Sequence, residues 1–124
     1  MVALDLRDRE GRVLLQQRPP GKHHAGLWEF PGGKVESGEN PRVALCREIA
    51  EELGIGLDPA DLVPTFVADD GPQAGIVLFL YSAASWTGGI VAGEGQAWGW
   101  FTLVEALELP MPPMDRHFIE RCVR

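Results

Sequence analysis

The most constraining feature of this sequence is the segment from Asn40 to Gly54, which carries both a start signal and a stop signal for a helix. Asn40 is a favourable N-cap residue because its side chain can accept a hydrogen bond from a backbone N–H of the first turn. Pro41 suits the first helical position, where its missing N–H costs nothing. Gly54 is typical of the residue after the last turn, because glycine adopts left-handed backbone angles readily. The pattern therefore predicts a helix over residues 41–53.

The two faces of this predicted helix differ in chemistry. Glu48, Glu51 and Glu52 fall on one face, because residues three and four apart lie above one another on a helix. The opposite face is apolar and is expected to pack on a sheet; it carries Cys46, Ile49, Ala50 and Leu53. Carboxylates at these spacings repel one another by about 0.2–0.5 kcal/mol per pair. They also lie in the second half of the helix, where the helix dipole disfavours negative charge.

A divalent cation would remove this repulsion. Clustered carboxylate oxygens are hard ligands, which suit Mg²⁺ or Mn²⁺. The alternative is an acidic face that is simply solvated. Charge clustering alone leaves both interpretations open.

Composition limits the classes of function. The length of 124 residues predicts one domain over residues 1–124. The apolar fraction of 45% is typical of a globular protein. The net charge of −7 argues against binding to polymeric nucleic acid, since no broad basic face is available. No apolar run approaches the roughly 20 residues of a membrane span, and no basic and apolar leader opens the chain. We therefore expect a cytoplasmic protein with no membrane association, and the sequence predicts no protein partner.

The rest of the chain alternates strand-like and helix-like segments. Strands are expected at residues 2–6 and 12–18, joined as a hairpin, and at 63–69, 76–82 and 97–102, with 76–82 central because it is almost entirely apolar. A helical turn at 104–109 and a terminal helix at 115–123 follow. The predicted fold class is α+β, with helices packed on a mixed sheet.

The spacing around the acidic helix is more specific than its charge. From Gly33, five residues lead to Glu39 and seven more lead to Arg47-Glu48-Ile49-Ala50-Glu51-Glu52-Leu53-Gly54-Ile55. This run matches the Nudix box, G-x5-E-x7-R-E-U-x-E-E-x-G-U with U apolar, at every specified position over residues 33–55. The chain thus resembles the Nudix hydrolases, and the resemblance implies their fold, an α/β/α sandwich with a mixed β-sheet.

The resemblance also implies roles for the residues of the box. The backbone carbonyl of Gly32 and the carboxylates of Glu48, Glu51 and Glu52 would hold the metal, expected to be Mg²⁺ with Mn²⁺ as a substitute. Arg47 would orient Glu48, with Glu39 or a helix carboxylate as its partner. The plainer alternatives are a surface pair between Arg47 and Glu51, and a first-turn acid at Glu39.

The segments that flank the box narrow the resemblance to MutT-type nucleoside triphosphate pyrophosphohydrolases. They are the lead-in Leu27–Glu36, the Glu94-Gly95-Gln96 loop and Pro112-Pro113-Met114-Asp115. The resemblance implies hydrolysis of a nucleoside triphosphate to the monophosphate and pyrophosphate. Glu48 and Glu94 are the two candidates for the base, and Glu94 is also a candidate metal ligand. Candidate substrate-binding residues are Arg18, which suits a phosphate, and His23, Phe30, Lys34 and Asp115.

Asp115 stands where the best-known bacterial members have an asparagine that reads the purine edge. An ionised aspartate only accepts hydrogen bonds, which suits the N1–H and N2–H₂ donors of guanine, whereas a protonated one can also donate. The alternative role is an N-cap for the terminal helix.

The favoured hypothesis is an enzyme that sanitises the nucleotide pool, with 8-oxo-dGTP or dGTP as its substrate and Glu48, Glu94 and Arg47 in catalysis. CTP, a modified pyrimidine nucleotide or a nucleoside diphosphate sugar is the second hypothesis. A non-catalytic nucleotide-binding module is the third, although this chain keeps every carboxylate of the box.

Overall fold

The strands form two sheets. The computed structural model describes residues 1–21, 25–73 and 75–123. The first sheet has the order β4-β1-β6-β5 and is mixed, because β1 and β6 are parallel while the other neighbours are antiparallel. The second is antiparallel, with the order β3-β2-β7. The strands are β1 (Val2–Leu6), β2 (Val13–Gln17), β3 (Trp28–Glu29), β4 (Gly32–Gly33), β5 (Val63–Asp69), β6 (Val77–Ala83) and β7 (Trp98–Phe101).

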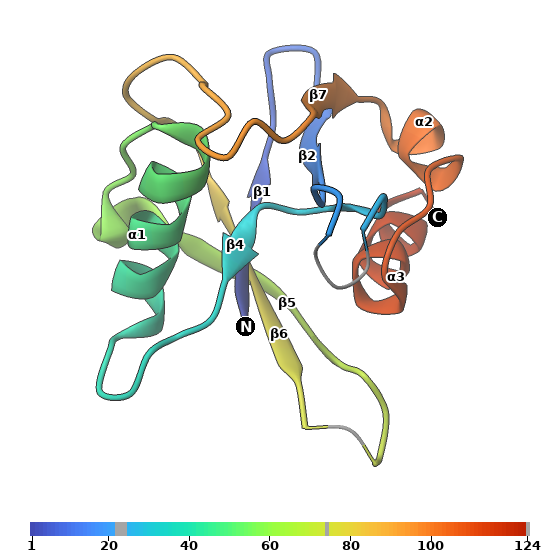
Figure 1. Cartoon of the computed structure of the whole chain (residues 1–124), viewed down its shortest axis with the longest axis horizontal. Coiled ribbons are helices and arrows are strands. Elements are labelled where there is room, and N and C mark those ends of the chain that lie inside the picture. Colours follow the sequence, from blue (N-terminus) through green and yellow to red (C-terminus); the bar gives the residue numbers. More distant parts are fainter. Residues whose placement is uncertain (22–24, 74, 124) are drawn as a thin grey trace.

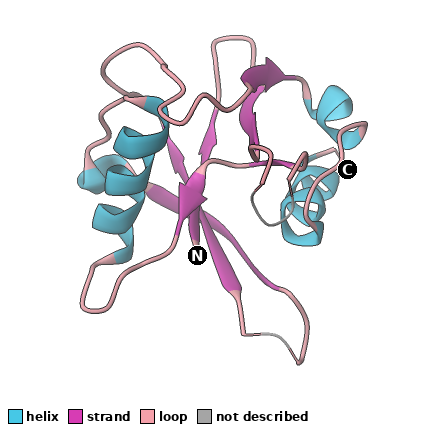
Figure 2. Ribbon diagram, viewed as in Figure 1, coloured by secondary structure: helices cyan, strands magenta, loops and turns pink. Residues whose placement is uncertain are grey.

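Helices flank the strands on two sides. The helix α1 (Pro41–Leu53) lies on one side, whereas α2 (Leu103–Leu107) and α3 (Pro113–Cys122) lie on the other (Figure 1). A short 3-10 helix, η1 (Pro59–Asp61), follows α1. Coloured by secondary structure, the chain shows strands between two helical layers (Figure 2). This arrangement confirms the predicted α+β sandwich with a mixed sheet.

Each side of the strands has its own buried cluster. On the α1 side, Leu45, Ile49 and Leu53 pack with residues of β1 and β2. On the α3 side, Phe118 and Ile119 pack with other residues of the same strands. Both faces of β1 are therefore covered, which explains why all five of its residues are buried. Within the described residues, no helix has the length and apolar character needed to cross a membrane.

Several expected elements differ from the structure. The predicted hairpin of residues 2–6 and 12–18 forms only at its turn, where Arg7 makes an antiparallel bridge with Val13 and the N–H of Asp8 donates to the Arg12 carbonyl at 3.0 Å. Beyond this turn, β1 and β2 belong to different sheets. The central β1 pairs instead with β4 and β6, which are distant in sequence. The terminal helix begins at Pro113 rather than at residue 115. The turn at 104–109 is α2, which a capping box of Thr102 and Glu105 starts at Leu103.

Candidate active site

The helix α1 positions most of the box residues. The side chain of Asn40 accepts hydrogen bonds from the N–H groups of Arg42 and Val43, and Gly54 takes left-handed backbone angles with φ of 69°. Both ends of the helix therefore follow from capping residues that the sequence shows, and the predicted bounds of 41–53 are confirmed.

The glycine pair before the helix allows two close approaches. Gly32 and Gly33 form β4 and pair with Ala3 and Val2 of β1. A Cβ atom on Gly32 would overlap the carbonyl oxygen of Val2, and one on Gly33 would overlap the carboxylate of Glu48. The absence of both side chains lets β4 lie against β1 on one side and against Glu48 on the other.

Arg47 joins the start of the box to its acidic helix. Its Nε and Nη2 donate to the two carboxylate oxygens of Glu39, both at 2.9 Å, and its Nη1 donates to Oε1 of Glu48 at 2.9 Å. The hydrogen bonds from Arg47 hold the pKa of Glu39 down at about 2. The partners predicted for Arg47 are thus present, whereas the nearest contact to Glu51 is a longer 3.7 Å. Arg47 fixes the side chain of Glu48 from one side.

Glu52 is the buried carboxylate of the set. It is 9% exposed, and its Oε2 accepts a hydrogen bond of 2.7 Å from Nε2 of Gln16. Burial raises the pKa of Glu52 to about 7; the bond from Gln16 opposes this rise and the charge of Glu48 adds to it. The carboxylates of Glu48 and Glu52 therefore repel each other, and the Glu52 carboxylate is shielded from water.

Glu51 and Glu94 do not join this pair in the structure. Both are exposed, Glu51 on the outer side of α1 and Glu94 on the loop that precedes β7. Within residues 1–21, 25–73 and 75–123, no three His, Cys, Asp or Glu side chains are grouped closely enough to hold a metal ion. The predicted clustering of all three box carboxylates is therefore not seen, because the helix turns Glu51 toward solvent while Glu52 faces β2.

Glu52 and Glu94 line a cleft of about 680 Å³. This volume lies in the range typical of small-molecule sites. The cleft has a polar part from β2, β4, α1 and the loop before β7, lined by Gln16, Arg18, Gly32, Gly33, Lys34, Glu52, Glu94 and Gln96. It has a largely apolar part lined by Met1, Ala3, Leu27, Phe30, Ile76, Leu78, Pro112, Pro113 and Met114.

Asp115 lies in the wall of the cleft and does not cap α3. The cap position is Pro112, and the Oδ2 of Asp115 accepts the backbone N–H of Phe30 at 3.0 Å. The N-cap alternative is therefore wrong, because the proline pair starts the helix earlier. Burial raises the pKa of Asp115 to about 7; the Phe30 N–H opposes the shift, and the charge of Glu29 adds to it.

Of the other predicted substrate-binding residues, Arg18 and Phe30 line the cleft. Arg18 pairs with Glu29 at 3.1 Å and lines the cleft. Burial raises the pKa of Glu29, and Arg18 opposes this shift. Phe30 is almost wholly buried and packs edge-to-face on Phe118, so it forms a wall of the cleft. His23 lies outside the described residues.

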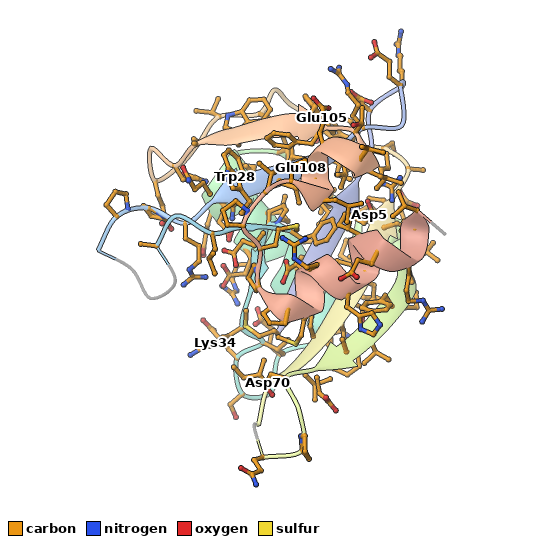
Figure 3. All side chains as sticks on the ribbon, turned by 90° about the vertical axis from the view of Figure 1, so that its right-hand side faces the viewer. Asp5, Trp28, Lys34, Asp70, Glu105 and Glu108 are labelled. Carbon is orange, nitrogen blue, oxygen red and sulfur yellow. The ribbon has the colours of Figure 1, made fainter. Side chains whose placement is uncertain are left out.

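Lys34 lines the cleft together with Asp70, although the two come from distant segments. Both labelled side chains lie toward the end of the molecule where the β5–β6 connection projects (Figure 3). The carbonyl oxygen of Lys34 accepts a hydrogen bond of 3.3 Å from Nη2 of Arg47. The backbone of Lys34 is thus tied to the box.

Two buried polar residues of the site were not singled out from the sequence. Gln16 and Gln96 are 6% and 7% exposed, and both line the cleft beside Glu52. A lone glutamine has no spacing pattern that indicates a site. The only available signal was position: Gln16 interrupts an apolar strand, and Gln96 follows the Glu94-Gly95 pair.

The raised pKa of Asp115 predicts a pH-dependent stability. Its value is about 7 in the folded protein against an ordinary 3.8, so between these pH values the folded state keeps a proton that the unfolded state has lost. Stability therefore falls as pH rises through this window. Asp115→Asn removes the ionisation. We expect its free energy of unfolding, relative to the wild type, to increase by about 3 kcal/mol between pH 5 and pH 8.

Urea unfolding of the metal-free protein at the two pH values measures this difference. The contribution of Glu52 is common to both proteins and cancels in the comparison to first order. A stability difference between the variant and the wild type that stays constant from pH 5 to pH 8 contradicts the prediction.

The chain belongs to the NUDIX family: residues 1–122 match the family described as NUDIX domain. It is a Nudix hydrolase of the MutT type, a pyrophosphohydrolase class that acts on nucleotides. It is 40% identical to a CTP pyrophosphohydrolase of Escherichia coli over 91% of this chain and 83% of that protein. It is 38% identical to an 8-oxo-dGTP diphosphatase of Haemophilus influenzae over 94% of this chain and 85% of that protein.

Solved structures show the same likeness. A structure reported in a study of MutT from Aliivibrio salmonicida and Vibrio cholerae superimposes with a TM-score of 0.83, at 26% identity, over 98% of this chain and 94% of that chain. The likeness therefore extends over nearly the whole length of both chains. Nudix hydrolases generally use divalent metal ions.

Proposed function

We propose that this Nudix hydrolase is a Mg²⁺-dependent enzyme that cleaves a nucleoside triphosphate to the monophosphate and pyrophosphate. The observation that carries the proposal is one cleft lined by both Glu52 and Asp115. Glu52 comes from α1 and Asp115 from α3, which lie on opposite sides of the strands (Figure 1). A ligand that fills the cleft would thus meet Glu52, whose carboxylate suits a metal ion, in the polar part. It would also meet the buried carboxyl group of Asp115 and the apolar lining residues.

The residues present fit a magnesium ion. Mg²⁺ commonly keeps several waters and binds one or two protein carboxylates together with substrate phosphates. Glu48 and Glu52 supply such a pair; burial raises the pKa of Glu52, and the charge of Glu48 adds to this rise. The carbonyl of Gly32 and the exposed carboxylates of Glu51 and Glu94 would complete the oxygen donors. When bound, Mg²⁺ would neutralise charge on the phosphate oxygens and lower the pKa of the attacking water.

The surrounding residues would position the substrate and move the proton. Arg47 holds Oε1 of Glu48, so this carboxylate is oriented as a ligand. Glu94 is exposed at the cleft and is therefore our first candidate for the general base, ahead of Glu48. Arg18 and Lys34 would contact phosphate oxygens. Phe30 and Leu78, which line the cleft, would cover the nucleobase of the substrate.

The first candidate substrate is 8-oxo-dGTP, with dGTP as its unmodified counterpart. An ionised Asp115 accepts hydrogen bonds from the N1–H and N2–H₂ groups that guanine presents. Several relatives are named 8-oxo-dGTP diphosphatase, which supports this choice.

CTP is the second candidate. The relative that is 40% identical carries the name CTP pyrophosphohydrolase. The amino group of cytosine can also donate a hydrogen bond to a carboxylate, so Asp115 is compatible with either guanine or cytosine.

A nucleotide panel tests the proposal. 8-oxo-dGTP, dGTP, CTP, dCTP and a nucleoside diphosphate sugar would each be incubated with the enzyme, with Mg²⁺ or with a chelator. Pyrophosphate release that requires Mg²⁺ is expected, with the highest kcat/KM for 8-oxo-dGTP. A preference for CTP would replace the first candidate by the second. Release of single phosphates only, or no turnover of any nucleotide, would refute the proposal.

A further inference from the structure

The strongest feature that the proposed mechanism leaves unused is a buried chain of amide hydrogen bonds. Gln16 lies on β2, Gln96 lies just before β7, and Glu52 lies near the end of α1. Nε2 of Gln16 donates to Oε2 of Glu52 at 2.7 Å, and Oε1 of Gln16 accepts from Nε2 of Gln96 at 3.0 Å. Three segments that are far apart in sequence are thereby joined at the floor of the cleft.

The backbone around this chain determines which way each amide points. The carbonyl oxygen of Glu52 can only accept, and it faces Nε2 of Gln96 at 2.9 Å. The N–H of Glu94 can only donate, and it faces Oε1 of Gln96 at 3.0 Å. Gln96 therefore has one possible orientation. Its Nε2 must donate to Oε1 of Gln16, which leaves Nε2 of Gln16 to donate to the Glu52 carboxylate.

The same loop also docks on the end of α1. The last carbonyl groups of a helix lack partners within the helix. The N–H of Gly93 donates to the Glu52 carbonyl at 2.8 Å, and the N–H of Val91 donates to the Leu53 carbonyl at 2.9 Å. A Cβ on Gly93 would overlap the carbonyl oxygen of Glu51. The loop that carries Glu94 thus satisfies helix carbonyls by direct contact, and it is seen passing from the α1 side to β7 in Figure 1.

We propose that Gln16 and Gln96 are positioning residues that hold the backbone of Glu94 in register with the carboxylate of Glu52. This inference rests on the proposed function, in which both carboxylates serve the hydrolysis of a nucleotide. The geometry gives each glutamine a separate task. Gln96 holds the loop to the helix end and to the Glu94 N–H, whereas Gln16 ties this assembly to the Glu52 side chain.

Gln96→Met keeps the approximate volume of the side chain and removes its hydrogen bonds. We expect kcat for the preferred nucleotide to fall by about 10–100-fold, because misplacement of a reacting group by about 1 Å can cost that much, while KM changes by less than about threefold. In a Glu94→Gln background, the same substitution is expected to add little, since its effect acts through Glu94. Thr65→Val is the control, because it removes the hydrogen bond that the Thr65 hydroxyl on β5 donates to the Leu80 carbonyl on β6, and Thr65 does not line the cleft.

Hydrogen exchange of the metal-free protein supplies a readout that does not depend on turnover. In Gln96→Met, the amide hydrogen of Glu94 is expected to exchange about tenfold faster than in the wild type and in Thr65→Val. Gln16→Met provides a second variant should Gln96→Met fail to fold. It leaves the bonds of Gln96 to the helix and to Glu94, so it should lower kcat with a smaller change in exchange.

The outcomes separate the two proposals. Suppose that the wild type is active. The positioning role alone is then overturned if Gln96→Met leaves both kcat and the exchange of the Glu94 amide unchanged. It is overturned as well if the losses of kcat from Gln96→Met and Glu94→Gln multiply independently. A wild type that cleaves no nucleotide refutes the proposed function and the positioning role together. Loss of kcat at steady KM, absent in the Glu94→Gln background and accompanied by faster exchange, supports the inference.

Discussion

Replacing Glu52 by glutamine is expected to lower kcat by roughly 10²–10⁴, equivalent to several kcal/mol of transition-state stabilisation. Glutamine has nearly the same shape but no negative charge, so it would hold a divalent cation weakly. Glu51→Gln is expected to fall in the same range, although Glu51 is exposed and Glu52 is buried. The measurement is pyrophosphate release at saturating nucleotide and Mg²⁺.

Loss of activity in Glu52→Gln should not come from loss of folding. Burial raises the pKa of Glu52 to about 7, so its charged form destabilises the metal-free protein at pH 8, and a neutral isostere removes that cost. The melting temperature of the metal-free variant at pH 8 should therefore equal or exceed that of the wild type. Glu120→Gln, at an exposed position of α3 outside the cleft, is the matched control and should keep full activity. Near-normal turnover in both Glu51→Gln and Glu52→Gln would defeat the assignment.

The parts of this site that could be predicted from the sequence are those that depend on local structure. Asn40, Pro41 and Gly54 set the ends of α1 through contacts within one turn, so the bounds of the helix follow from the sequence. Arg47 is adjacent in sequence to its partner Glu48, and its pairing with Glu39 was one of the predicted alternatives. The mixed sheet followed from the alternation of strands and helices, and from the resemblance to the Nudix fold.

The parts that could not be predicted depend on which distant segments meet. The helical period places Glu51 and Glu52 on one face, but only the packing of β2 beside α1 buries Glu52 and leaves Glu51 in solvent. The turn at residues 8–11 is compatible with a hairpin, yet β1 pairs with β6, which is more than seventy residues away in the sequence. Asp115 follows two prolines, a context that suits an N-cap, and only its contact with the Phe30 N–H shows another role.

A single methyl group at Gly33 is expected to lower kcat by about 100-fold while leaving the fold intact. The Cβ of Gly33→Ala would occupy the place of the Glu48 carboxylate, so that carboxylate must move away from β4. The obstructing atoms are the far end of a flexible side chain, and Gly33 has no positive φ, so the change in stability should stay within about 1 kcal/mol. Pyrophosphate release and urea unfolding of the same preparation measure the two effects.

Two other glycines provide the controls that locate this effect at Glu48. Gly89→Ala adds the same methyl group where nothing lies within 4 Å and φ is not positive, so both its activity and its stability should match the wild type. Gly32→Ala would overlap the backbone of Val2 and Ala3, so it should destabilise the protein by pushing β4 from β1. A loss of stability in Gly33→Ala as large as that in Gly32→Ala would contradict the predicted intact fold. A wild-type kcat in Gly33→Ala, as in Gly89→Ala, would show that the close approach of β4 to Glu48 has no catalytic purpose.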